Sequence, residues 1–153
     1  KLRFQSFDCE NRWSAYRNCS CRIGPEDMQK LSCDIDFKAQ IKQMWCKYKL
    51  LVPRPAHNTV MVLFEGSFDV CQFLQEKRLP NVLAQYVYEN MVRDSNMPKQ
   101  CPFNEGPLYF HNISVLDNFP AVLPEMDFTL FLTFSKPNTT NEVELILKGS
   151  LLE

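Results

Sequence analysis

The chain has 153 residues and carries 17 basic and 18 acidic side chains, which gives a formal net charge of −1. This balance argues against a nucleic-acid-binding protein and against a polybasic membrane-binding protein, because both need a dense positive field. With 45% apolar and 23% charged residues, the composition is that of a globular protein. The length indicates one domain, residues 1–153, and no apolar run approaches the ~20 residues needed to cross a bilayer.

Glycine and histidine are too sparse for the common catalytic motifs. The four glycines lie far apart, so no dinucleotide-binding motif and no P-loop is present, and only two histidines occur. The chain also lacks the HExxH zinc motif and the GxSxG nucleophile motif. We therefore expect no enzyme, no catalytic residues, no cofactor and no bound metal. A hydrolase is the weakest interpretation.

The first half of the chain shows the alternation of apolar and polar residues that is typical of strands with one buried face. This pattern predicts strands over residues 2–7, 31–37, 40–52 and 59–64. A loop tied by disulfides is expected after the first strand. Residues 53–58, with two prolines, are expected to form the turn between the last two of these strands.

A helical insertion of about residues 69–93 interrupts the strand pattern. Apolar residues there recur at helical spacing, which predicts two short helices over 69–76 and 80–93. Pro80 suits the first turn of the second helix. Asp69 can cap the first helix by accepting a backbone N–H. The alternative, a ligand-binding carboxylate at Asp69, is less favoured.

Strands return in the last third, over residues 108–115, 128–134 and 142–149, and the last two form a hairpin across the loop 136–141. Strands without regular βαβ crossovers predict an all-β fold, an antiparallel β-sandwich or β-cup. Because the two-helix insertion is amphipathic, it must lay its apolar face on a sheet edge or over the mouth between the sheets.

Cysteine usage favours a secreted protein with up to three disulfides and one thiol left over. The alternative is a cytosolic protein with buried thiols. Cys33 and Cys46 lie on neighbouring predicted strands and could pair, whereas Cys9 could pair with either Cys19 or Cys21. An odd number of cysteines also leaves a covalent dimer open. The seven are Cys9, Cys19, Cys21, Cys33, Cys46, Cys71 and Cys101, and none forms a CxxC pair.

Three Asn-x-Ser/Thr sequons also favour secretion, at Asn18, Asn112 and Asn138. Asn138 is the best candidate for glycosylation, because it lies in the polar loop 136–141. The chain opens at Lys1 without a basic-then-apolar segment. We therefore expect a mature form whose leader was removed or omitted.

Two segments carry a resemblance to a known family. Residues 62–74, Val-Leu-Phe-Glu-Gly-Ser-Phe-Asp-Val-Cys-Gln-Phe-Leu, lead from a strand through an Asp-x-Cys turn into a helix, and residues 96–103, Asn-Met-Pro-Lys-Gln-Cys-Pro-Phe, place an asparagine shortly before Cys-Pro. The tail 123–130 adds weaker support. Over about residues 59–152 the chain resembles secreted insect proteins of the CheA/CheB chemosensory type. These are similar to the ganglioside activator protein and, more distantly, to ML lipid-recognition proteins.

The resemblance implies a β-cup, in which two antiparallel sheets splay at one end around an apolar cavity. It also implies secretion, disulfide bonding, and binding of a lipid or another hydrophobic small molecule without catalysis. A disulfide between Cys71 and Cys101 is implied as well, and it would fasten the helical insertion to the sheet.

The candidate cavity wall consists of large apolar side chains on predicted strands and helices. Each could instead be an ordinary core residue. The second helix is either a lid that shifts to admit ligand or a static cap. The candidates are Trp45, Phe64, Phe68, Phe73, Leu83, Tyr86, Val87, Phe110, Phe128, Leu130 and Phe134.

A basic cluster of Lys38, Lys42, Lys47, Lys49 and Arg54 is best interpreted as a solvated sheet face. The alternative is that it attracts an anionic headgroup at the cavity mouth. Taken together, the sequence predicts a secreted protein that holds a hydrophobic ligand, in a chemosensory or lipid-transfer context, with a membrane receptor as a further partner. The alternative function is an extracellular protein-interaction module with a filled core, acting as a ligand or co-receptor.

Overall fold

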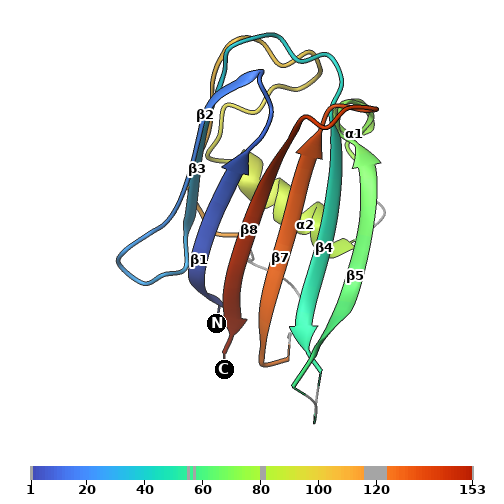
Figure 1. The fold of residues 1–153 in the computed structure, drawn as a ribbon. Helices are drawn as coiled ribbons and strands as arrows, with labels where there is room; N and C mark the ends of the chain where they lie inside the picture. Colours follow the sequence, from blue (N-terminus) through green and yellow to red (C-terminus); the bar gives the residue numbers. More distant parts are fainter. Residues whose placement is uncertain (1, 55, 57, 80–81, 116–123, 153) are drawn as a thin grey trace.

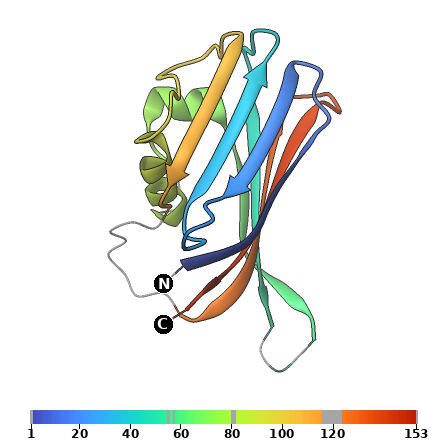
Figure 2. The ribbon, with the colours of Figure 1, turned by 90° about the vertical axis from the view of Figure 1, so that its left-hand side faces the viewer.

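The structure, a computed structural model, describes residues 2–54, 56, 58–79, 82–115 and 124–152. These residues form two antiparallel sheets packed face to face (Figure 1 and Figure 2). One sheet has the strand order β1-β8-β7-β4-β5 and the other β2-β3-β6, and the described strands close no barrel. The strands are β1 (Leu2–Asn11), β2 (Tyr16–Ile23), β3 (Leu31–Phe37), β4 (Trp45–Pro53), β5 (Val60–Asp69), β6 (Gly106–Ile113), β7 (Met126–Ser135) and β8 (Glu142–Leu151).

The predicted all-β sandwich with a helical insertion is confirmed. Strand β3 has the predicted bounds, and β7 and β8 form the predicted hairpin. The main difference is β2, where the sequence predicted a loop. The inward positions of β2 are held partly by Cys19 and Cys21. Because the residues between Tyr16 and Ile23 are arginine, asparagine, cysteine and serine, the middle of the segment lacks the β-branched and aromatic residues that usually mark a strand.

The register fixes which side chains of the five-stranded sheet face inward. Leu132 on β7 pairs with Leu145 on β8 and with Tyr48 on β4. Directly paired residues of antiparallel strands share a face, so these three side chains point toward the three-stranded sheet. Their neighbours Phe131 and Ile146 pair on the outer face.

Two core clusters divide the space between the sheets. The larger core, which includes Phe37, Met44 and Phe103, lies where β3 ends and β4 and β6 begin. The smaller core lies at the opposite end, where β1 and β3 begin and β6 ends, and consists of Phe4, Leu31, Ile113, Val115 and Leu147. The sandwich is therefore packed more heavily at the larger-core end.

The two helices lie beside β6, on the inner side of the five-stranded sheet (Figure 1 and Figure 2). The first begins after Asp69, whose carboxylate accepts the backbone N–H of Cys71 at 2.9 Å and of Gln72 at 3.2 Å. This is the predicted cap. The predicted role of Pro80 lies outside the described residues. The helices are α1 (Val70–Glu76) and α2 (Val82–Val92).

A disulfide attaches the insertion to the segment before β6, and hydrogen bonds of Asn96 attach that segment to β6. A disulfide joins Cys71 on α1 to Cys101, as the family resemblance implies. The amide of Asn96 donates to the carbonyl of Pro107 at 2.8 Å and accepts the backbone N–H of Tyr109 at 2.7 Å. Asn96 therefore extends the hydrogen bonding at the edge of β6. Asn96 and Cys101, the two residues that carry the resemblance in segment 96–103, thus both have a structural role.

The predicted Cys33–Cys46 pair is wrong. Strands β3 and β4 follow each other in sequence but belong to different sheets, and both thiols are free and buried. The sulfur of Cys33 lies 3.4 Å from that of Cys21 instead. The other predicted pairing, of Cys9 with Cys19 or Cys21, is not formed in this structure either, although these three sulfurs lie together.

Candidate functional site

The inner face of β7 and β4 is less covered than that of β8. On β8, Leu145 and Leu147 are each 7% exposed, whereas their partners on β7, Leu132 and Leu130, are only half-buried. Since β7 is a central strand, a continuous second layer would bury these side chains fully. The layer over this region is α2, not a strand (Figure 1). We name Tyr48, Phe64, Phe128, Leu130 and Leu132 the half-covered patch.

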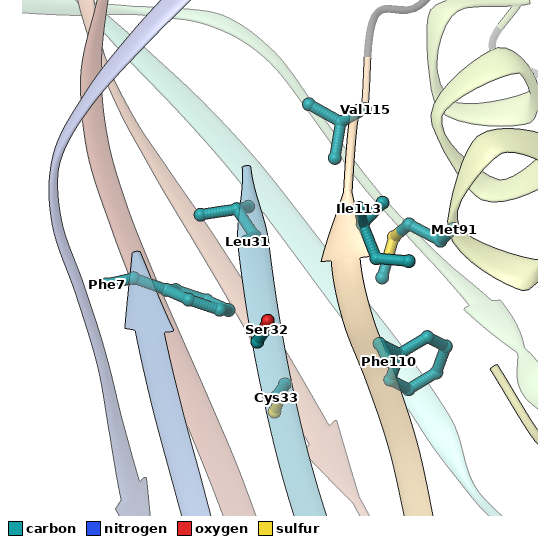
Figure 3. Close-up of a pocket in the computed structure, with 8 residues that line it drawn as sticks. All are labelled: Phe7, Leu31, Ser32, Cys33, Met91, Phe110, Ile113 and Val115. Carbon is teal, nitrogen blue, oxygen red and sulfur yellow. The ribbon is translucent and has the colours of Figure 1, made fainter. Parts of the chain in front are cut away.

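A small apolar pocket lies between the sheets near the smaller core (Figure 3). Its volume is about 30 Å³, which is room for roughly two water molecules. Ligand pockets begin near ~300 Å³, so this pocket holds no lipid-sized molecule unless a neighbouring element moves. The lining residues are Phe7, Leu31, Ser32, Cys33, Met91, Phe110, Ile113 and Val115.

Two contacts orient α2 over this region. The ring of Tyr88 packs edge-on against Phe73 of α1, with ring centroids 4.4 Å apart. The buried side chain of Asn90 donates a 2.9 Å hydrogen bond to the carbonyl of Val115, just beyond the end of β6. From the same helix, Met91 reaches the small pocket (Figure 3). The helix therefore forms a wall between the pocket and the outside.

The predicted cavity residues are distributed over several places. Phe110 lines the small pocket. Phe64, Phe128 and Leu130 belong to the half-covered patch. Phe73 is buried. The remaining predicted residues on the inner face or in the second helix are half-buried: Phe68, Phe134, Leu83, Tyr86 and Val87. The predicted set therefore does not come together at the small pocket.

The prediction that Trp45 belongs to the cavity wall is wrong. Its β7 partner is Ser135, and the next residue, Cys46, points into the core. Because side chains alternate along a strand, Trp45 lies on the outer face, where it is 41% exposed. The side chain therefore takes no part in the space between the sheets.

Several residues that line the small pocket were missed, notably Phe7 and Leu31. Met91, in contrast, belongs to the apolar stripe of the second helix, which was predicted to be a lid or a static cap. Leu31 belongs to a clear alternating strand. The alternation shows that one face of that strand is buried, but it does not show which other strand faces it. That information is carried by long-range pairing.

The outer face of the three-stranded sheet is polar. The carboxylate of Asp34 lies 2.8 Å from Nε2 of His111 and 2.6 Å from the guanidinium of Arg22. The hydrogen bond with His111, followed by the contacts with Arg22, holds the pKa of Asp34 below its ordinary value. These groups are about half-exposed, so they form a solvated face with no cavity role.

The predicted basic cluster is consistent with the solvated interpretation. Lys47 and Lys49 are exposed on the outer face of β4, alternating with Cys46, Tyr48 and Leu50. Lys38, Lys42 and Arg54 are also exposed. The three sequon asparagines, Asn18, Asn112 and Asn138, are exposed as well. Neither described helix is long and apolar enough to span a bilayer.

Three thiols gather where β1 meets β2. The sulfurs of Cys9, Cys19 and Cys21 lie within 4.8 Å of one another, and this is the group of side chains in the described part of the chain whose geometry could hold a metal ion. Burial is the largest cause that raises the pKa of Cys9 to about 12. A raised thiol pKa opposes metal binding, because the thiolate is the ligand.

Comparison with known proteins places the chain in a family. None of the curated proteins matches it. A family described as "Protein of unknown function (DUF1091)" matches residues 46–130, from the start of β4 into β7. That segment is 85 of the 153 residues (46 through 130). It includes the capping Asp69, the Cys71–Cys101 disulfide and Asn96. The chain therefore belongs to the family described as Protein of unknown function (DUF1091).

Proposed function

We propose that this protein binds a lipid or another hydrophobic small molecule between its two sheets. The half-covered patch is the observation that supports the proposal. Central strands of a filled sandwich bury their inner faces, yet here aromatic and leucine side chains of β7 and its neighbours are only half-buried. An apolar chain lying on the patch would remove this surface from water, which is worth roughly 25 cal/mol per Å².

The side chains around the site suit an apolar ligand. The surface that lines the small pocket is apolar, and the hydroxyl of Ser32 instead accepts the backbone N–H of Asn112. A ligand with ~10 buried methylene groups gains about 8 kcal/mol, and association entropy removes several kcal/mol of this gain. Micromolar binding then needs no special polar contact. The proposal involves no covalent step, so the protein acts as a carrier, not as an enzyme.

The proposal assigns α2 the role of a lid. Because the volume of the small pocket is about 30 Å³, that pocket can take a fatty chain only when α2 moves away from the half-covered patch. The larger core and the Cys71–Cys101 disulfide fix the opposite end of the sandwich. Opening is therefore expected at the smaller-core end.

The extracellular setting is part of the proposal. A disulfide is typical of an oxidising compartment, and Asn18, Asn112 and Asn138 are accessible to glycosylation. The resemblance to secreted insect chemosensory proteins supports the same setting. We accordingly propose a chemosensory or lipid-transfer role, with a membrane receptor as a further partner.

The experiment uses two phenylalanines on opposite faces of β7. Phe128 belongs to the half-covered patch, whereas Phe131 lies on the outer face. Full-length secreted protein is titrated with a fluorescent fatty-acid probe and analysed by native mass spectrometry for co-purified lipid. We expect micromolar probe binding that Phe128→Ala weakens at least about fivefold, equivalent to ~1 kcal/mol.

The control variant Phe131→Ala should bind the probe like the parent, after circular dichroism confirms that both variants are folded. Absence of both co-purified lipid and probe binding in the parent would overturn the proposal. Equal weakening by both variants would show that the probe does not bind at the patch.

A protein-interaction module is the second candidate, and the outer face of β4 and β5 favours it. Trp45 and Val62 are 41% and 42% exposed there, close to Lys47 and Lys49. Aromatic residues are enriched in protein interfaces relative to the rest of the surface. If the parent takes up no hydrophobic probe while Trp45→Ala abolishes cell-surface binding, this second function holds instead.

A further inference from the structure

Four cysteines on three strands form one cluster between the sheets. Cys9 on β1 belongs to the five-stranded sheet, and Cys19, Cys21 and Cys33 belong to the three-stranded sheet. The sulfurs of Cys9, Cys19 and Cys21 lie within 4.8 Å of one another. The sulfur of Cys33 lies 3.4 Å from that of Cys21.

The strand register explains this arrangement. Cys21 and Cys33 are direct partners on β2 and β3, so their side chains point to the same face. Cys19 is two residues before Cys21 and therefore shares that face. Cys9 pairs with Leu145 and faces inward from the opposite sheet. All four thiols pack against the larger core, and none is exposed.

We propose that the cluster forms two disulfides in the secreted protein, Cys9–Cys19 and Cys21–Cys33, and that Cys46 remains the one free thiol. Cys21 and Cys33 are assigned to each other because they are opposite and closest. Cys9 then pairs with Cys19. With Cys71–Cys101, six of the seven cysteines are paired, and the buried Cys46 is not accessible for a covalent dimer.

Each bond forms by exchange with the disulfide of an oxidising thiol–disulfide oxidoreductase. A cysteine thiolate attacks one donor sulfur, which breaks the donor disulfide and gives a mixed disulfide. The thiolate of the second cysteine then attacks the chain's sulfur in that mixed disulfide and releases the donor. The chain loses two electrons and two protons per bond, and the donor leaves as a dithiol that has taken them up.

The thiols of the cluster differ in their readiness to react. Hydrogen bonds with Cys19 and Cys21 lower the pKa of Cys33, against the opposing effect of burial. Hydrogen bonds with Cys19 and Cys33 raise the pKa of Cys21. These opposite directions make Cys33 the thiol that the cluster favours as a thiolate, which is the form that attacks a disulfide.

A zinc site fits the same atoms less well. Four sulfurs around zinc lie roughly 3.8 Å apart, from tetrahedral bonds of ~2.3 Å, whereas Cys21 and Cys33 are 3.4 Å apart. Structural zinc ligands are commonly separated by two to four residues, but a single serine separates Cys19 from Cys21. The chain also already contains a disulfide, and such bonds persist where thiols are oxidised.

The two bonds would close one side of the sandwich. Strand β1 is an edge of the five-stranded sheet and β2 is an edge of the three-stranded sheet. A Cys9–Cys19 bond therefore joins the two sheets directly. The Cys71–Cys101 disulfide attaches α1, which follows the other edge strand β5. Both sides are then fastened near the larger core.

The test is disulfide mapping of full-length secreted protein. The protein is deglycosylated, denatured without reductant, alkylated and digested with trypsin, which cleaves after arginine and lysine. We expect residues 4–12, 18–22 and 31–38 to travel as one species held by two disulfides, and Cys46 in residues 43–47 to carry the only alkyl group. The intact protein should be six hydrogens lighter than its reduced form.

Two variants test which cysteines carry the alkyl groups. Cys46→Ala should carry none, and Cys9→Ser should carry two, on Cys19 and Cys46. Five alkylated cysteines in the parent would overturn the proposal, and so would zinc released in a one-to-one ratio on thiol modification. A peptide 31–38 linked to 43–47 would restore the Cys33–Cys46 pair and overturn it as well.

Discussion

The ring of Phe128 lies over Gly149, its antiparallel partner on β8. A Cβ at position 149 would come within 2.9 Å of that ring and within 2.7 Å of the carbonyl oxygen of Arg3 on β1. Since real Cβ atoms do not approach so closely, the bare glycine allows the ring and the β1 backbone to contact β8 together. One residue thus couples the half-covered patch to the edge of its sheet.

Gly149→Ala should therefore destabilise the protein by about 1–3 kcal/mol, as overpacking generally does. The displaced ring should also change probe binding at the patch. Urea unfolding monitored by circular dichroism measures the first effect. Gly24→Ala is the matched control, because a Cβ there would lie 3.5 Å from Lys30, an ordinary contact. Its expected effect is within about 0.5 kcal/mol, and equal losses in the two variants would contradict the packing argument.

The hydrogen bond from Asn90 to the carbonyl of Val115 should hold α2 closed. Asn90→Ala leaves that buried carbonyl without its partner, so we expect a loss of about 1–3 kcal/mol. Hydrogen exchange of the α2 amides should accelerate, and a lid should then admit the fatty-acid probe faster. Glu89→Ala, at an exposed position of the same helix, is the control. An unchanged association rate for Asn90→Ala would identify α2 as a static cap.

Local patterns were sufficient for much of the fold. Alternation located β3 and the β7–β8 hairpin, and helical spacing located both helices. The cap at Asp69 followed from a single side chain and its position. These features depend on residues that are close together in the sequence, so local patterns are sufficient to predict them.

The pairing of distant strands was not predictable in the same way. Strand β4 pairs with β7, about eighty residues later, and not with β3. For this reason the Cys33–Cys46 prediction failed. The size of the pocket was equally inaccessible, because it depends on how closely Met91 and its helix approach the sheets. No short pattern encodes that distance.

Asp34 should contribute stability that disappears in acid. Its pKa is lowered in the folded state, chiefly by the hydrogen bond with His111. The contribution is therefore present above the unfolded pKa and is lost as pH falls through the folded pKa. Because the group is 44% exposed, the effect is under about 1 kcal/mol. Urea unfolding of Asp34→Asn should show a deficit at pH 7 that vanishes near pH 2, and a pH-independent deficit would contradict the ion-pair assignment.

Glycosylation should be visible in protein secreted from eukaryotic cells. Asn138 is exposed in the turn between β7 and β8, where a glycan meets no neighbouring strand. Asn138→Gln should remove one glycan and lower the free energy of unfolding by about 1 kcal/mol, because Asn138 has φ 60°, a left-handed conformation that asparagine tolerates better than glutamine. Gel mobility before and after treatment with an N-glycosidase measures the change. Identical mobility of the parent and the variant would mean that this sequon is unused.

Cys46 should make stability fall at alkaline pH. Burial raises its pKa to about 12, above the ordinary value of 9.0. The thiol is therefore favoured in its neutral form by folding, and its contribution is present below pH 9 and is lost as pH rises toward 12. Cys46→Ala creates a small cavity and should cost about 1 kcal/mol at pH 7. Between pH 9 and 11 its unfolding free energy should decline less steeply than that of the parent. Parallel declines would show that another group, such as the buried Tyr16, dominates alkaline unfolding, because burial also raises the pKa of Tyr16.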